Sequence, residues 1–592
     1  MKKLLVYLKD YTKESILAPL FKMLEASFEL LVPLVVASMI DKGIPEGNVS
    51  YIIKMCGLMV LLGVIGLACS VTAQFFAAKA AVGFATKLRH VLFTHVQSLS
   101  FSELDTIGET TLITRLTSDI NQVQSGVNMV LRLFLRSPFI VLGAMVMAFT
   151  IDWKAACIFA VVIPLLSVVV FGIMAVSIPL YRKVQERLDA VLGITRENLS
   201  GVRVIRAFHR EKEEQERFGA GNEELTRTQN YVGKISAFMN PVTYVLINGA
   251  LVALLYVGAI RVDTGILTQG QVVALVNYMS QILVELIKLA NLIITVTKSF
   301  ACANRIEKVL EVRNSQEELS GAADVSCERE LLQDNAGQLR TGAEVPVVEF
   351  RNVSLTYPGA GGSALRDLSF VANPGETIGI IGGTGSGKTS LVHLIPRFYD
   401  ASKGQVLVDG KDVREYSTKE LRARVGIVMQ KSVLFCGSIR ENLRWGKEDA
   451  TDEELMEALS IAQATEVVAG KENGLSAEVT QGGKNFSGGQ RQRLCIARAL
   501  VRKPEILILD DSASALDYAT DAHLRGAIRS QADSRVVFIV SQRTSSIRYA
   551  DRIIVLEDGN AVGIGTHEEL LDSCPVYREI YESQYEGGAD GE

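Results

Sequence analysis

Long apolar stretches without charges constrain the fold of this chain more than any other feature of its sequence. The ranges 55–78, 155–181 and 235–260 contain no charged residue, and each is long enough to cross a bilayer as a helix. The range 264–284 is nearly as clear. These four stretches predict membrane-spanning helices in the first half of the chain.

Two weaker stretches, at 16–40 and 130–151, complete a predicted set of six spans. Both contain or adjoin charged residues, namely Lys22, Glu25, Glu29, Arg132 and Arg136. With 48% hydrophobic residues and a mean hydropathy of +0.23, the whole chain is too apolar for a purely soluble protein. We therefore predict an all-α transmembrane domain with six helices over residues 1–310.

The basic residues predict the orientation of these spans. The short loops at 41–50, 152–154 and 261–269 carry one basic residue each, whereas the segment 182–234 carries many. The N-terminus carries four, at Lys2, Lys3, Lys9 and Lys13. By the positive-inside rule, both termini and the two long loops between spans are cytoplasmic.

Three pairs of charged residues lie in or beside the predicted spans. The members of each pair are three or four positions apart, so they share a helix face. Charges inside a bilayer are costly and usually face a cavity or a partner. A role in a substrate cavity is one reading, but we favour a structural role, in pairing between subunits or in cytoplasmic extensions of the helices. The pairs are Glu25 with Glu29, Arg132 with Arg136, and Glu285 with Lys288.

The second half of the chain contains a phosphate-binding loop. Residues 382–389 fit the pattern G-x-x-x-x-G-K-[ST], between an apolar run at 377–381 and a helical pattern at 390–395. Glycines let backbone N–H groups point at phosphate oxygens, Lys388 should reach the β- and γ-phosphates, and Thr389 should coordinate Mg²⁺. The residues predicted to bind ATP here are Gly382, Gly383, Thr384, Gly385, Ser386, Gly387, Lys388, Thr389 and Ser390.

A second motif supplies the acidic side of the same site. The apolar run 506–509 predicts a central strand that ends at Asp510. Open α/β sheets bind ligands at the carboxyl ends of their strands. Asp510 is therefore predicted to hold the Mg²⁺ water shell.

Between these motifs, the segment 485–493 resembles the signature of the ATP-binding cassette (ABC) family, usually Leu-Ser-Gly-Gly-Gln, with Phe486 in place of Leu. Other family landmarks follow the same order. Tyr357 matches the aromatic residue that stacks on adenine, Gln430 matches the Q-loop glutamine that also contacts Mg²⁺, and residues 514–517 match the D-loop.

The resemblance implies an exporter half-transporter, with a membrane domain fused to an α/β P-loop ATPase domain over 346–592 and a linker at 311–345. In the family, two cassettes face each other head to tail. Each ATP then lies between the phosphate loop of one chain and the signature of the other. The signature residues predicted to face the partner's ATP are Ser487, Gly488, Gly489 and Gln490.

Two cytoplasmic segments also resemble parts of ABC exporters. Residues 102–119 and 199–208 are similar to the first and second intracellular loops. In the family, short helices in these loops dock on the cassettes and transmit closure to the spans.

Besides Phe486, two further positions depart from the family pattern, and both are predicted catalytic residues. Asp511 stands where Glu usually polarises the attacking water, and Gln542 stands where His usually contacts the γ-phosphate. Asp is one methylene shorter than Glu, which withdraws the carboxylate by roughly 1 Å and can cost on the order of 100-fold in rate. Gln cannot carry the charge of an imidazolium. Both changes affect hydrolysis and spare ATP binding.

This pattern resembles one half of the heterodimeric ABC exporters, in which a different chain supplies Glu and His at a second site. The predicted function is ATP-driven export of small amphipathic molecules, drugs, lipids or peptides. The alternatives are a homodimeric exporter that uses Asp511 as a weak base, and an ATP-gated or regulatory membrane subunit. The predicted location is the bacterial inner membrane, with the cassette in the cytoplasm.

The composition excludes other functions. The formal net charge of −5 argues against nucleic-acid binding. No cluster of His, Cys and carboxylates suggests a metal other than ATP-bound Mg²⁺. The eight cysteines show no CxxC spacing and are predicted to be free thiols.

Overall fold

The computed structural model describes residues 3–316, 346–512, 516–530 and 535–585. The chain divides into two units, and each is described by itself. The first contains Met1–Gln97 and Thr110–Val312, and the second contains Ser98–Glu109 and Arg313–Glu592. The short segment 98–109 therefore belongs to the unit that carries the phosphate loop.

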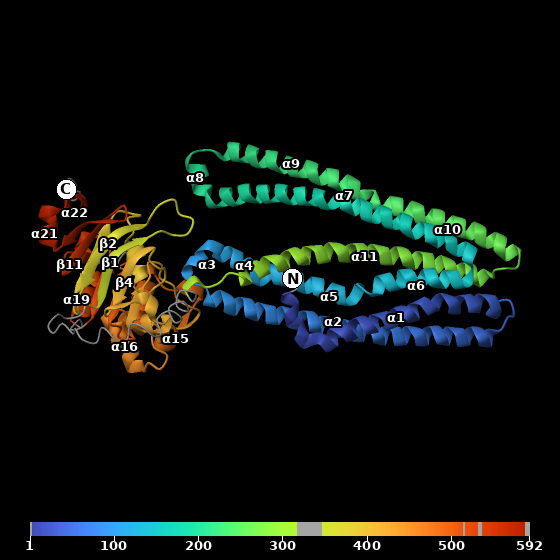
Figure 1. The fold of residues 1–592 in the computed structure, drawn as a ribbon, viewed down its shortest axis with the longest axis horizontal. Helices are drawn as coiled ribbons and strands as arrows, with labels where there is room; N and C mark the ends of the chain where they lie inside the picture. Colours follow the sequence, from blue (N-terminus) through green and yellow to red (C-terminus); the bar gives the residue numbers. More distant parts are fainter. Residues whose placement is uncertain (1–2, 317–345, 513–515, 531–534, 586–592) are drawn as a thin grey trace, which may run out of the picture. The chain divides into compact units, whose positions relative to one another are not determined.

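Within the described residues, six helices are long and apolar enough to cross a membrane, which confirms the predicted set (Figure 1). They run over Leu4–Gly43, Val49–Ser98, Glu109–Ile151, Trp153–Ser200, Glu211–Asp263 and Gln269–Leu310. Most extend well past the apolar stretches. The second has 50 residues, about 75 Å of helix, whereas the hydrocarbon core is about 30 Å thick.

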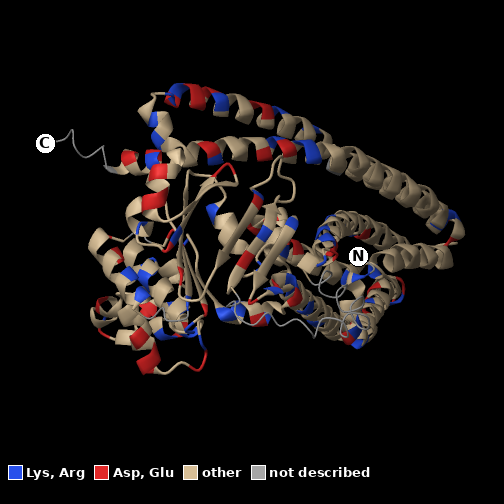
Figure 2. Ribbon diagram, turned by 60° about the vertical axis from the view of Figure 1, so that its left-hand side comes forward, with Lys and Arg blue, Asp and Glu red and all other residues tan. Residues whose placement is uncertain are grey.

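The elements of this unit follow each other almost without loops. In chain order they are η1 Leu4–Tyr11, α1 Thr12–Ser38, η2 Met39–Gly43, α2 Val49–Ser98, α4 Glu109–Thr114, η3 Arg115–Asp119, α5 Ile120–Leu133, α6 Arg136–Ile151, α7 Trp153–Ser200, α8 Val202–Ala207, α9 Glu211–Ala237, α10 Met239–Asp263 and α11 Gln269–Leu310. The charges are concentrated on α9 and the second half of α7, while α10 is almost free of them (Figure 2). This distribution agrees with the predicted spans.

Small residues allow close packing of the membrane helices. Helix α11 packs against α1, α5 and α6, and α7 packs against α9 and α10. Gly126 on α5 is one such contact, because a Cβ there would lie 2.2 Å from the Ser299 hydroxyl on α11. Small residues at helix interfaces let backbones approach in a bilayer, where burial of apolar surface gives no driving force.

A buried ion network joins three of these helices. The Arg136 guanidinium on α6 donates to Glu29 on α1 and to Glu285 on α11, both at 2.7 Å. Ser137 also donates to Glu285, at 2.7 Å, and Lys288 donates to it at 2.8 Å. These charges thus pair with one another within the chain, across three helices, as a structural role requires.

The second unit is built on two main sheets. The larger has the strand order β12-β11-β3-β10-β9-β6, with only β12 antiparallel to its neighbour, and the smaller, antiparallel sheet has the order β2-β1-β4-β5. The strands are β1 Val348–Leu355, β2 Leu365–Ala372, β3 Thr377–Gly382, β4 Lys403–Val408, β5 Lys411–Asp412, β6 Val425–Val428, β7 Gly437–Ser438, β8 Glu478–Val479, β9 Ile506–Asp510, β10 Val536–Val540, β11 Arg552–Glu557 and β12 Asn560–Gly565. The pair β7 and β8 forms a separate ribbon.

Helices surround these sheets. They are α3 Phe101–Ile107, α13 Lys388–Leu394, α14 Thr418–Arg424, α15 Ile439–Arg444, α16 Asp452–Ile461, α17 Thr465–Ala469, α18 Gly488–Leu500, α19 Tyr518–Arg529, α20 Thr544–Ile547, α21 His567–Ser573 and α22 Pro575–Tyr585. The strands predicted at 377–381 and 506–509 and the helix predicted at 390–395 are confirmed as β3, β9 and α13. The two intracellular segments contain the short helices α3 and α8.

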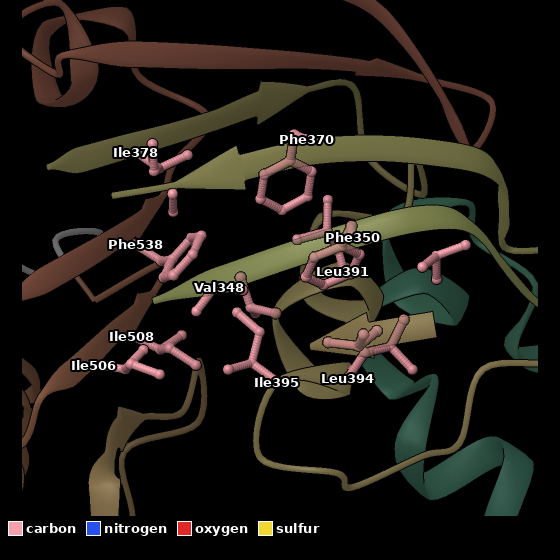
Figure 3. Close-up of a cluster of buried hydrophobic side chains, with 14 of the residues drawn as sticks. Val348, Phe350, Phe370, Ile378, Leu391, Leu394, Ile395, Ile506, Ile508 and Phe538 are labelled. Atoms are coloured by element: carbon pink, nitrogen blue, oxygen red, sulfur yellow. The ribbon is translucent and has the colours of Figure 1, made fainter. Parts of the chain in front are cut away.

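One hydrophobic core fixes the position of α13. Phe350 and Phe370 from the small sheet stack at 4.5 Å, and Phe538 from β10 contacts the edge of that pair (Figure 3). Leu391 and Leu394 of α13 are buried in the same cluster. The helix that begins with Lys388 is therefore held between the two sheets.

Some predictions lie outside the described residues. They concern residues 317–345 of the predicted linker, Ser514 and Ala515 of the predicted D-loop, and Cys327. The seven described cysteines are free, as expected.

Replacement of Arg136 by Met should destabilise the membrane unit. The substitution keeps most of the volume but leaves Glu285 buried beside fewer positive charges, a change that typically costs about 3–5 kcal/mol. We expect a clearly lower thermal unfolding midpoint for R136M than for R132M, one helical turn earlier, where the described residues record no ion pair. Adding Glu285→Gln to R136M should recover part of the loss. Equal midpoints for the two single variants would contradict the structural role.

Candidate nucleotide-binding site

The loop 382–389 joins β3 to α13 and has a backbone that requires glycine. Gly387 has a φ of +97°, and a Cβ there would lie 2.6 Å from the carbonyl oxygen of Ala364. Gly385 has a φ of +84°. An L side chain rarely adopts such angles, so these two positions let the loop close around a ligand.

Lys388 extends its ammonium group inside this loop. The ammonium donates to the carbonyl oxygens of Gly382 at 2.9 Å and Gly383 at 2.6 Å. Burial lowers the pKa of Lys388, while the nearby carboxylates of Asp511 and Asp510 act to raise it. The positive charge thus lies where the sequence predicts the phosphates.

On the acidic side of the site, one carboxylate oxygen of Asp510 is buried and accepts no hydrogen bond from a described residue. The Thr389 hydroxyl donates to Oδ1 of Asp510 at 3.0 Å, whereas Oδ2 of Asp510 is buried without a hydrogen bond to any described residue. Burial raises the pKa of Asp510 to about 6, and the charge of Asp511 adds to this. Hard oxygen ligands suit Mg²⁺, so Thr389, Asp510 and the Gln430 amide oxygen fit this cation. When bound with ATP, Mg²⁺ would supply charge neutralisation at the phosphates.

These residues line one cavity of about 330 Å³ at the carboxyl ends of β3, β9 and β10. Its lining includes most of the residues predicted from the sequence, namely Tyr357, Thr384, Gly385, Gly387, Lys388, Thr389, Ser390, Gln430, Asp510, Asp511 and Gln542. Gly382, Gly383 and Ser386 lie in the same loop. The structure brings the predicted residues together, and their individual roles in ATP binding stay predictions.

The signature residues begin a helix of their own. The Ser487 hydroxyl accepts a hydrogen bond from the Gln490 amide at 3.3 Å, and the Gln490 side chain accepts one from the Ser487 amide at 3.0 Å, which caps α18. Neither residue, nor Gly488 or Gly489, is among the residues that line the cavity. This arrangement suits a signature that serves another chain's nucleotide. Phe486, one of the departures from the family pattern, is buried in a second hydrophobic core.

Two residues beside the cavity were missed by sequence reasoning. The Nε2 atom of His393 lies 3.9 Å from Oδ2 of Asp510, and the Tyr399 ring stacks on the His393 ring. Burial lowers the pKa of His393 to about 4, so the contact with Asp510 at neutral pH is not an ion pair. A single His in a helix gives no sequence signal for this placement.

Comparison with known proteins decides the family. The family model described as "ABC transporter transmembrane region" matches residues 15–286, and the model described as "ABC transporter" matches residues 365–514. An ABC transporter ATP-binding protein of Mycobacterium tuberculosis is 36% identical over 583 residues, 98% of this chain and 97% of the relative. The chain belongs to the ABC transporter family.

Other relatives agree with an exporter half-transporter. An ATP-dependent lipid A-core flippase of Desulfotalea psychrophila is 32% identical over 495 residues, 83% of each chain. A structure of a bacterial Atm1-family ABC exporter with ATP bound has the same fold, with a TM-score of 0.75 over 97% of this chain and 98% of that chain, at 22% identity. The protein is thus an integral membrane ABC exporter half-transporter with an ATPase domain.

Asp510→Asn should weaken Mg²⁺-dependent nucleotide binding at this site by about tenfold or more, because the amide is a poorer ligand for Mg²⁺ than the carboxylate. Photolabelling of the chain with azido-ATP, titrated with and without Mg²⁺, measures this. Asp511→Asn is the matched control and should leave binding nearly unchanged. An equal loss in both variants would contradict the assignment of the two carboxylates.

Proposed function

We propose that this half-transporter pairs with a different half-transporter and exports amphipathic small molecules, lipids or peptides, with a catalytically weak ATP site on its own phosphate loop. The observation that carries the proposal is the presence of both Asp511 and Gln542 on the cavity. The residues expected to hold ATP and Mg²⁺ line the same cavity, so the defect concerns hydrolysis and not binding.

The backbone around Asp511 does not compensate for the shorter side chain. Asp511 has a φ of +47°, and its amide donates to the carbonyl oxygen of Val540 at 3.0 Å. A residue fixed in this way to β10 cannot move forward without breaking the bond. The carboxylate of Asp511 therefore lies about 1 Å further from an attacking water than that of a Glu, which is a large misplacement for a general base.

The backbone of Gln542 is held by a contact with α22. It follows β10, and its carbonyl oxygen accepts a hydrogen bond from the side chain of Gln584 on α22 at 2.8 Å. The side-chain amide of Gln542 can donate a hydrogen bond to a phosphate oxygen. It carries no positive charge, so it cannot balance the negative charge that shifts in the transition state. Two independent changes, Asp511 for Glu and Gln542 for His, affect hydrolysis in the same site. This favours a specialised site that does not hydrolyse ATP over neutral sequence variation.

The residues give each step a role. Lys388 and the phosphate loop bind ATP, Tyr357 stacks on adenine, and the signature at Ser487–Gln490 completes the partner's site. Closure of the two cassettes would move α3 and α8, which transmit the motion to the spans. A Glu and a His of the partner would hydrolyse the second ATP and reset the cycle. The lipid A-core flippase among the relatives supports an amphipathic substrate for this chain.

Two other functions have weaker support. A homodimer in which Asp511 acts as a weak base requires no partner, but leaves both sites slow. A regulatory membrane subunit with little turnover would fit the weak site but gives no reason for the preserved signature. Vectorial transport with measurable turnover would exclude the regulatory function.

ATP turnover in lipid tests the proposal. The chain purified alone should hydrolyse ATP at least 100-fold more slowly than the chain co-expressed with a second half-transporter that has Glu and His at the matching positions. In the chain alone, Asp511→Glu with Gln542→His should restore turnover. Full activity of the unmodified chain alone would favour the homodimer and overturn the proposal.

A further inference from the structure

We infer that Tyr399 and His393 are positioning residues that connect helix α3 to both ends of the nucleotide site. One end is Tyr357, where adenine is predicted to stack, and the other is Asp510, the predicted Mg²⁺ ligand. The inference rests on the proposed ATP site of this chain but not on the identity of its partner.

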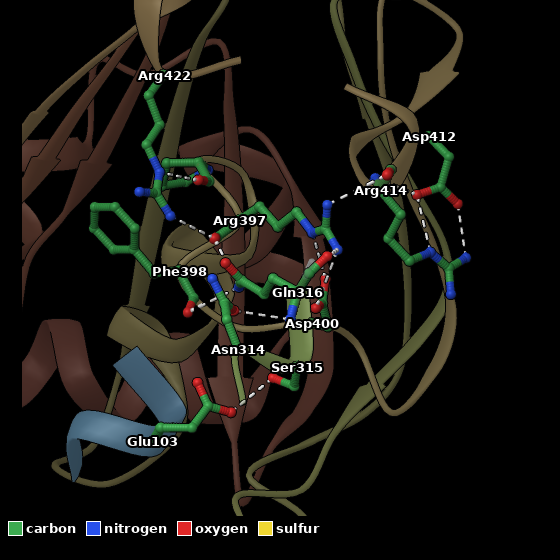
Figure 4. Close-up of polar contacts among 11 residues, drawn as sticks. Glu103, Asn314, Ser315, Gln316, Arg397, Phe398, Asp400, Asp412, Arg414 and Arg422 are labelled. Atoms are coloured by element: carbon green, nitrogen blue, oxygen red, sulfur yellow. Dashed lines mark hydrogen bonds and ion pairs between the residues drawn. The ribbon is translucent and has the colours of Figure 1, made fainter. Parts of the chain in front are cut away.

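Helix α3 is fastened to the unit that carries the phosphate loop. The Phe101 ring lies 4.5 Å from the Phe398 ring, and the Ser315 hydroxyl donates to Glu103 at 2.7 Å (Figure 4). The Asn314 amide donates to the carbonyl oxygen of Ser98 at 2.7 Å. These contacts fasten the first turn of α3 and Ser98, which precedes the helix, so this end of the helix is tied to the residues that it touches.

Tyr399 is the residue through which α3 reaches the adenine end. Its hydroxyl donates to the Asp105 carboxylate on α3 at 2.5 Å. Its ring meets the Tyr357 ring edge to face, with centroids 5.0 Å apart. The Tyr357 hydroxyl in turn donates to Ser390, next to the phosphate loop, at 2.9 Å. A shift of Asp105 therefore displaces a ring that supports the predicted adenine platform.

His393 extends the connection to the other end. Its ring is nearly parallel to the Tyr399 ring, at 16° with centroids 6.3 Å apart. His393 lies one helical turn after Thr389 on α13, so both side chains face the same direction. Thr389 bonds one oxygen of Asp510, and the Nε2 atom of His393 lies 3.9 Å from the other.

The two facing atoms are complementary. Nε2 of His393 and Oδ2 of Asp510 are both buried, and neither has a hydrogen bond to a described residue. A movement of about 1 Å would bring them to hydrogen-bonding distance. Because partners of metal ligands set the orientation of those ligands, the position of His393 controls how well Asp510 presents its carboxylate to Mg²⁺.

Through this connection, a site that binds ATP without hydrolysing it can still act on helix α3. Occupancy by Mg²⁺ and ATP fixes Asp510 and Tyr357, and both contacts converge on Tyr399 and Asp105. Helix α3 then responds to nucleotide binding itself. Coupling of this kind is measured as an interaction between two substitutions.

The test uses azido-ATP photolabelling of this chain in the full-length transporter in lipid, titrated with and without Mg²⁺. His393→Phe keeps an aromatic ring but loses the nitrogens. It should raise the half-saturating concentration about tenfold with Mg²⁺ and leave it unchanged in EDTA. His393→Gln restores a donor and should recover binding to within about twofold.

The link to α3 is tested by Tyr399→Phe, which keeps the ring contacts and removes only the bond to Asp105. It should weaken Mg²⁺-dependent labelling about threefold in the unmodified chain and cause no further loss in the His393→Phe background. Equal weakening with and without Mg²⁺, or independent effects of the two substitutions, would overturn the inference. Because labelling reports only this chain's site, these outcomes are separate from whether the chain alone hydrolyses ATP.

Discussion

The parallel pairing of three central strands determines the chemistry of this protein. Val540 of β10 lies opposite Ile380 of β3 and opposite Asp510 of β9, so β9 and β10 end at the same level and β3 ends two residues further on. The phosphate loop, the two carboxylates and Gln542 follow directly after these ends. A shift of register in any strand would separate Lys388 from Asp510. The buried Phe and Leu side chains that hold α13 between the sheets stabilise this register, because an altered pairing would expose them to water.

The membrane unit depends on two kinds of contact between its helices, namely paired charges and close packing of small residues. Buried charge there is compensated by opposite charge where Glu29 and Glu285 pair with Arg136. Close contacts of small residues, such as Gly126 against Ser299, supply the remaining packing. The network ties α1, α6 and α11 to one another through Arg136.

Much of the fold was predictable because its signals are local. Charge-free stretches identify spans, and the phosphate loop, Asp510 and the signature each occupy a few consecutive residues, so the cavity residues could be named in advance. The partners of Arg136, by contrast, are far away in sequence, and pairing within one chain could not be distinguished from pairing between chains. No motif marks His393 and Tyr399, because their placement depends on contacts with residues far away in sequence, such as Tyr399 with Asp105 and His393 with Asp510. The burial of Phe486 in a hydrophobic core likewise depends on residues far from the signature in sequence.

The fate of the ATP bound to this chain tests most directly whether its own site is catalytically weak. The co-expressed transporter would be photolabelled during turnover with azido-ATP that carries its radioactive phosphate in either the α or the γ position. We expect both labels to remain on this chain, because its ATP is not cleaved, whereas the partner chain should retain only the α label. Loss of the γ label from this chain at the turnover rate would show that Asp511 and Gln542 support hydrolysis and would contradict the proposed division of labour.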